Sequence, residues 1–152
     1  MPRIDIGKLT ARTSTAYPDE FKPVVAGREK TALGNAAGLT QFGVNLTRLK
    51  PGAASALRHW HENEDEFVYV LEGELVLVED EGETILKAGD CAGFKANVAN
   101  AHHLVNRSNR DALILEVGTR SPRERAHYPD VDLLYEVDGK NIRILHKDGT
   151  PY

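Results

Sequence analysis

Hydrophobic and polar residues alternate with a period of two along most of the central chain. The segments that combine this alternation with β-branched and aromatic side chains are 42–49, 66–71, 74–78, 84–86, 102–106 and 112–117. Successive side chains point to opposite faces of a strand, so the pattern predicts short strands. Helical periodicity is scarce, and turn residues such as Pro51-Gly52 follow the runs. An antiparallel sandwich or a closed β-barrel is therefore expected.

Three turn signals predict how these strands are connected. Glu72-Gly73 lies between 66–71 and 74–78, and Asp80-Glu81-Gly82 lies between 74–78 and 84–86. Short Gly-containing connections favour hairpins, so two hairpins are expected back to back. In the tail, Asp138-Gly139 joins two further strand candidates near 133–135 and 142–145.

The chain of 152 residues has the size of one domain. Residues 1–40 are punctuated by proline and glycine, which predicts an irregular N-terminal arm with a short strand near Val24-Val25. We expect the barrel core in residues 41–118. Residues 119–152 are expected to form a C-terminal extension, a β tail on the outside of the barrel.

Composition narrows the classes of partner. The formal net charge of -4 lacks the basic excess that a nucleic-acid backbone requires. The apolar runs are too short to span a membrane, and the N-terminal residues show no apolar signal segment. The one cysteine, Cys91, cannot form an internal disulfide and is expected to be a small buried residue. These features predict no nucleic-acid partner, no membrane and a cytoplasmic location.

Four of the six histidines occur in two close pairs, His59 with His61 and His102 with His103. On a strand, the His-x-His spacing points both imidazoles of the first pair to one side. Glu66, after a short turn, can bring a carboxylate to the same place, and the second pair can supply a fourth ligand. Imidazole and carboxylate together favour a divalent first-row transition metal, so this pattern predicts a metal site.

The stretch from Gly52 to Asn106 resembles the two signature motifs of the cupin superfamily. The matching residues are Gly52, His59-Trp60-His61, Glu66 and Gly73 in the first motif, and Gly89, Asp90, His102 and Asn106 in the second. The resemblance implies a double-stranded β-helix, or jelly-roll, barrel. It also implies a bound Fe, Mn, Ni, Cu or Zn ion with His59, His61, Glu66 and His102 as its ligands. His102 matches rather than His103, because three residues separate His102 from Asn106.

The chain departs from the family pattern in two places. Lys95-Ala96-Asn97 stands where cupins usually have a Pro-x-Gly turn, and six residues instead of five separate Gly52 from His59. Asn tolerates positive φ, so Asn97 is expected to form the turn. Asn106 is expected to hold a strand end rather than to contact substrate.

A metal-dependent enzyme acting on a small organic substrate is the leading functional hypothesis, with oxygenase, isomerase or lyase chemistry. The alternative is a non-catalytic cupin module that binds or senses a small ligand. The resemblance to small cupins also implies a homodimer. A mostly apolar cavity is expected around the metal, lined by Val68, Val70, Leu104, Phe42, Val44 and Leu46.

Overall fold

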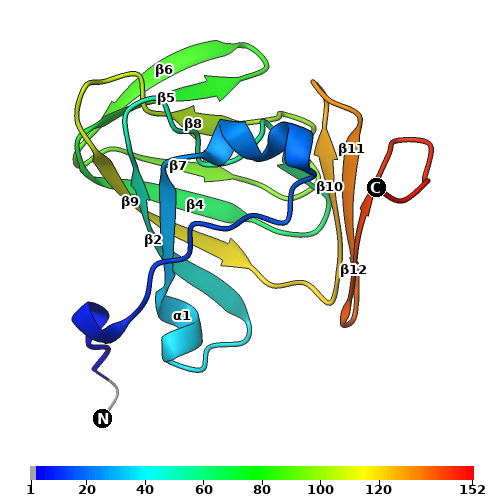
Figure 1. The fold of residues 1–152 in the computed structure, drawn as a ribbon, viewed down its shortest axis with the longest axis horizontal. Helices are drawn as coiled ribbons and strands as arrows, with labels where there is room; N and C mark the ends of the chain where they lie inside the picture. The colour runs from blue at the N-terminus through cyan, green and yellow to red at the C-terminus, as the bar shows by residue number, and fades with distance from the viewer. Residues whose placement is uncertain (1–2) are drawn as a thin grey trace.

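Three antiparallel sheets account for the strands of residues 3–152, the part of the chain that this computed structural model describes (Figure 1). The five-stranded sheet runs in the order β1 (Arg28–Ala32), β2 (Phe42–Leu49), β9 (Ala112–Thr119), β4 (Glu66–Glu72) and β7 (Cys91–Phe94). The three-stranded sheet contains β6 (Gly82–Lys87), β5 (Glu74–Glu79) and β8 (His103–Val105). The four-stranded sheet contains β12 (Asn141–Leu145), β11 (Leu133–Asp138), β10 (Arg123–Tyr128) and β3 (Trp60–His61). The predicted all-β jelly roll is confirmed.

The barrel core lies between the five-stranded and three-stranded sheets. Alternation in β4 buries Val68 and Val70 and leaves Phe67 and Tyr69 on the outer face. Inward residues of both sheets form one apolar cluster, which includes Leu49, Val68, Val70, Leu75, Leu77, Leu86, Leu104, Ala112 and Ile114. This burial of alternating side chains is the main source of stability in such a barrel.

The first predicted hairpin is wrong. β4 pairs with β7 and β9, whereas β5 pairs with β6 and β8. Gly73 has a φ of 82° and turns the chain from one sheet into the other, and a Cβ there would meet the Asp111 carbonyl oxygen at 2.8 Å. The second hairpin, β5 with β6, and the tail hairpin across Gly139 are confirmed.

The arm differs from its prediction near Val24-Val25. These residues end the 3-10 helix η2 (Asp19–Val25) instead of forming a strand. Phe21 and Val24 pack in a second small core with Tyr128 and Leu133, where Figure 1 shows η2 beside the β10 to β12 sheet. The other helices of residues 3–152 are η1 (Ile6–Lys8) and α1 (Leu33–Ala36). None of the helices in this range has the length and apolar character needed to cross a membrane.

The C-terminal extension is more closely joined to the barrel than predicted. Its strand β10 pairs with β3, the strand that carries His61. The four-stranded sheet therefore forms a wall beside the candidate site instead of lying wholly outside the barrel.

Cys91 is exposed, so the prediction of a buried cysteine is wrong. It begins β7, an edge strand in which Ala92 and Phe94 turn towards the core. Alternation therefore places Cys91 on the outer face, opposite Tyr69 of β4.

Asn106 is buried, and every polar atom of its side chain is bonded. Its Nδ2 donates to the carbonyls of Leu49 at 2.8 Å and Arg110 at 2.7 Å, and its Oδ1 accepts from the Ser108 amide at 3.0 Å. Asn106→Ala should lower the free energy of unfolding by about 2–4 kcal/mol, because two backbone carbonyls lose their partner. Chemical denaturation measures this loss. The exposed Asn109→Ala is the matched control, and equal stability of the two variants would contradict the assigned role.

Candidate metal centre

The structure brings together the four residues that the sequence marked as ligands. His59 lies opposite His102 in an isolated β-bridge, His61 lies on β3 and Glu66 begins β4. The Nε2 atoms of His102, His61 and His59 lie 2.8, 3.5 and 3.6 Å from the Glu66 carboxylate oxygens. The three imidazoles therefore converge through the same ring nitrogen on one carboxylate.

Backbone carbonyls orient the rings of two of these histidines. The Nδ1–H of His59 donates to the Leu57 carbonyl at 2.7 Å, and that of His102 faces the Asn100 carbonyl at 3.4 Å. A carbonyl can only accept, so each Nδ1 carries a proton, and Nε2 is the ring nitrogen that each histidine turns towards Glu66. An imidazole held through Nδ1 in this way can bind a metal through Nε2 once that nitrogen has no proton.

Carboxylates surround His61 on both sides of its ring. Its buried Nδ1 has no hydrogen-bond partner among residues 3–152, but Glu124 Oε1 and Glu64 Oε2 lie 3.7 and 3.8 Å away. Burial lowers the pKa of His61, but Glu124 and Glu66 outweigh it and raise this pKa to about 10. The surroundings thus favour a cation at this position.

Glu66 is ionised in this site. Burial alone would raise the pKa of its carboxyl group, but the contacts with His102, His59 and His61 hold it well below its usual range. Three imidazoles and one ionised carboxylate match the ligand preference of divalent first-row metals. The chemistry of the donor set therefore fits the metal that the sequence predicted.

A second group of three donors shares His61 and contains Glu64 and Glu124. The Glu124 oxygens already accept the backbone amides of Glu62 at 2.9 Å and Asn63 at 3.0 Å, and Glu64 accepts the Ser121 amide at 2.9 Å. Carboxylates bonded in this way are suited to orienting the imidazole from behind. We therefore place the candidate metal on the Nε2 side of His61.

His103 lies away from the cluster. Its Nδ1 bonds to the Ala56 carbonyl at 2.9 Å, and β8 turns its ring to the side opposite His102. The replaced turn keeps its shape, because Asn97 has a φ of 60° as predicted and its amide donates to the His61 carbonyl at 2.8 Å. The departure at 95–97 therefore leaves the cluster intact.

Aromatic rings pack against two of the histidines. The ring of Phe94 stacks on His102 with centroids 3.5 Å apart, and Tyr128 stacks on His59 at 5.6 Å. Such packing restricts the imidazole rotamers and excludes water from one side of each ring.

Two cavities open on the cluster, and both contact His61, Glu66 and His102. The smaller, of about 220 Å³, is bordered mainly by acidic and neutral residues, and Lys95 is the one lysine or arginine among the described residues that line it. The larger, of about 410 Å³, has four cationic side chains in its wall: Arg12, Arg28, Lys30 and Arg120. An anionic ligand is therefore favoured in the larger cavity.

The expected apolar lining is wrong in most of its members. Val68 and Leu104 do contact the larger cavity, but Val70 is fully buried in the barrel core. Phe42, Val44 and Leu46 share a face of β2 that points outward, because Thr47 and Leu49 are the buried positions. Because side chains alternate along a strand, a set of positions displaced by one residue from the buried ones lies entirely on the other face.

Sequence reasoning missed three charged residues of the site: Glu124, Glu116 and Arg28. Glu116 could have been found, because on a predicted strand it points to the same face as the apolar Ala112 and Ile114. Glu124 and Arg28 lie on β10 and β1, whose sequences RERAHY and REKTA lack apolar alternation and were not predicted as strands.

The chain is similar to one known protein family and to several solved structures. A cupin-domain family model matches residues 45–118. A sugar phosphate isomerase of the cupin superfamily from Silicibacter pomeroyi is 46% identical, with 99% of this chain and 96% of that one covered and a TM-score of 0.95. A candidate sugar phosphate isomerase from Acidithiobacillus ferrooxidans is 27% identical over 82% and 80% of the two chains, with a TM-score of 0.75.

A third solved structure, an oxalate decarboxylase predicted for Thermotoga maritima, is 23% identical over 78% of this chain and 99% of that one, with a TM-score of 0.63, and it supports the fold alone. No curated protein sequence matches the chain. The jelly roll with its histidine and glutamate cluster is a small β-barrel with a candidate metal site. The chain belongs to the cupin superfamily.

Proposed function

We propose that this protein is a metal-dependent isomerase of a small phosphorylated sugar. The observation that carries the proposal is one cavity that contains both the histidine and glutamate cluster and four cationic side chains. An ion at the cluster would meet the sugar oxygens, and the cations would meet the phosphate. The 46% identity to the Silicibacter pomeroyi sugar phosphate isomerase over almost the whole chain supports the same substrate class.

His59, His61, His102 and Glu66 would hold the metal. That ion would be divalent Fe, Mn, Ni, Cu or Zn. When bound, it supplies a Lewis acid that polarises a carbonyl oxygen of the sugar, with up to two coordination positions left for substrate. The carboxylates behind His61 keep its Nε2 aimed at that position.

Glu116 is proposed to move the proton during isomerisation. It is the one carboxylate besides Glu66 among the described residues that line the larger cavity. Lys30 Nζ at 3.1 Å and the Thr47 hydroxyl, which donates at 2.7 Å, hold its oxygen. An aldose and ketose interconvert when a base removes a proton from the carbon beside the carbonyl and returns it to the carbonyl carbon, while the hydroxyl proton of the first carbon passes to the former carbonyl oxygen.

The test is an assay of the metal-loaded protein with a panel of aldose and ketose phosphates in deuterated water. We expect one pair to interconvert, with deuterium appearing on the carbon that exchanges its proton. Tight binding of a sugar phosphate without interconversion or exchange would replace the isomerase with a ligand-binding module. Conversion of unphosphorylated sugars at equal rates would contradict the substrate class.

We also propose that the protein is a homodimer through the outer face of the five-stranded sheet. Apolar side chains of neighbouring strands cover this face, and they are Val44, Leu46, Phe67, Tyr69, Leu115 and Val117. The registers place Leu115 between Leu46 and Tyr69. A contiguous apolar surface of this kind suits a twofold interface, in which the same face of two copies packs together.

Tyr69→Glu should dissociate the dimer, because it places a charge in the middle of that apolar face. Light scattering should then report a mass near 16.8 kDa for the variant and about twice that for the parent chain. Ile142→Glu is the matched control, since Ile142 is an exposed apolar residue of the C-terminal sheet. A parent protein that is already monomeric at micromolar concentration would contradict the proposal.

A further inference from the structure

Arg28 is a buried guanidinium without a carboxylate partner within residues 3–152. Its side chain borders the larger cavity and the residue is 8% exposed. Nη1 donates to the Ser55 carbonyl at 2.7 Å, which is its one side-chain hydrogen bond in the described structure. Nε and Nη2 have no hydrogen-bond partner among residues 3–152, and neither atom is fully enclosed by protein. Burial of a charge is costly unless a counter-charge is supplied.

Arg12 brings a second uncompensated cation to the same cavity. Its backbone forms an antiparallel bridge with Lys30, with N–H···O distances of 2.8 and 2.9 Å, so the arm is fixed beside β1. Its side chain makes no ion pair or hydrogen bond with residues 3–152 and lines the cavity. Burial is the main cause that lowers the pKa of Arg28, Tyr17 and Glu116 partly offset it, and the nearby charge of Arg12 lowers this pKa further.

The remaining cations of this cavity are already occupied. Lys30 pairs with Glu116 at 3.1 Å, and Arg120 donates to the Leu39 carbonyl at 2.9 Å and to the Asn35 side chain of α1. Arg120 has no carboxylate partner among residues 3–152, but these neutral oxygens occupy both of its terminal nitrogens. Arg12 and Arg28 are therefore the two cations of this cavity that combine the lack of a carboxylate partner with free terminal N–H donors. A phosphate monoester carries about -1.5 to -2 at pH 7, whereas a carboxylate carries -1, so a phosphate group matches the two charges better.

We infer that Arg12 and Arg28 form the subsite that binds the phosphate group of the substrate. The inference rests on the proposed function for the sugar to which that phosphate belongs, but the subsite itself is defined by the two guanidinium groups. Arg28 supplies a fixed fork from β1, held by Ser55, and Arg12 reaches over the phosphate from the arm. Guanidinium groups bind phosphate oxygens through paired N–H donors.

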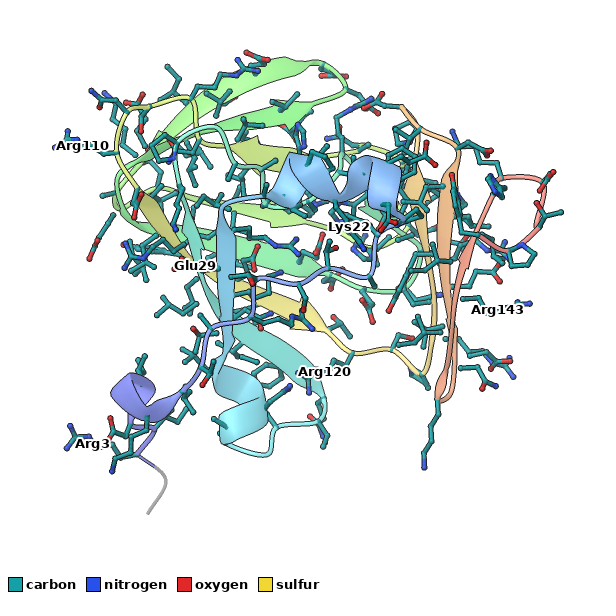
Figure 2. All side chains as sticks on the ribbon, viewed as in Figure 1. Arg3, Lys22, Glu29, Arg110, Arg120 and Arg143 are labelled. Carbon is teal, nitrogen blue, oxygen red and sulfur yellow. The ribbon has the colours of Figure 1, made fainter. Side chains whose placement is uncertain are left out.

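The experiment titrates inorganic phosphate into the full chain after chelation of metal, with calorimetry at constant ionic strength. Sulfate and acetate are separate arms. The parent chain should bind phosphate and sulfate, and acetate at least about ten-fold more weakly. Arg12→Gln and Arg28→Lys should each weaken phosphate binding about ten-fold or more. Arg110→Gln is the matched control, because Figure 2 shows Arg110 at the edge of the molecule, outside the larger cavity.

Arg28→Lys also changes the side chain that donates to the Ser55 carbonyl, so this variant can lower the stability of the fold as well as phosphate binding. Arg12 is exposed and contributes its backbone alone to the fold, so Arg12→Gln decides the question if Arg28→Lys unfolds. Unchanged phosphate binding in Arg12→Gln, no binding by the parent, or equal binding of acetate would each overturn the inference. Phosphate binding that Arg12→Gln weakens, in a protein that isomerises no sugar phosphate, would keep the subsite and remove the proposed function.

Discussion

His61→Ala and His102→Ala should each lower the metal affinity by about 100-fold or more, while His103→Ala leaves it unchanged. The Nε2 atoms of His61 and His102 lie 3.5 and 2.8 Å from the Glu66 carboxylate, so each variant removes one of four converging donors. His103 is the neighbour of His102 in sequence, but its Nδ1 bonds to the Ala56 carbonyl instead. Elemental analysis and competition titrations with a chelator measure the difference.

The parent chain should carry about one equivalent of a divalent first-row metal after loading. Circular dichroism of each variant tests whether the barrel is still folded, so that a loss of metal is separated from a loss of structure. Full metal occupancy in a folded His102→Ala protein would contradict the assignment of His102. Loss of metal in His103→Ala would contradict the distinction between the two histidines.

Glu116→Gln should lower the turnover of a sugar phosphate by about 10²- to 10⁴-fold, the usual contribution of a general base. Gln keeps the shape of the side chain and can accept the hydrogen bond from Thr47, but it cannot take up a proton at ordinary pH. Metal content should be unchanged, because Glu116 does not belong to the cluster of converging donors. Steady-state rates and deuterium exchange into the substrate measure the effect.

Glu29→Gln is the matched control for Glu116. Glu29 lies on β1 next to Lys30 and pairs with Lys50 at 3.2 Å, and it does not line the larger cavity. The control variant should match the parent in rate. A Glu116→Gln enzyme that keeps the parent rate of deuterium exchange would show that another group moves the proton.

Local patterns predicted most of the barrel strands but not all of their partners. The alternation in 66–71 and 74–78 is a property of each segment, and it marks which side chains turn inward. Glu72-Gly73 fits a hairpin turn equally well, whereas the structure uses Gly73 to pass between sheets. Pairing between distant strands such as β4 and β9 depends on closure of the whole barrel, which no local pattern contains.

The sequence predicted those site residues that lie on segments where the spacing shows which side chains point inward. His59 and His61 share a parity, and the spacing from His102 to Asn106 distinguished His102 from His103. Glu124 was missed because it reaches His61 from 63 positions away, on a strand rich in charge. Arg28 was missed for a related reason, since a charged residue in an edge strand reads as exposed until the fold buries it.

The measurement that tests the account most directly is anomalous diffraction from crystals of the metal-loaded protein. The account predicts one strong peak among the Nε2 atoms of His59, His61 and His102 and the Glu66 carboxylate. A peak on the other side of His61, bound by its Nδ1 with Glu64 and Glu124, would contradict it, as would the absence of any peak at the cluster.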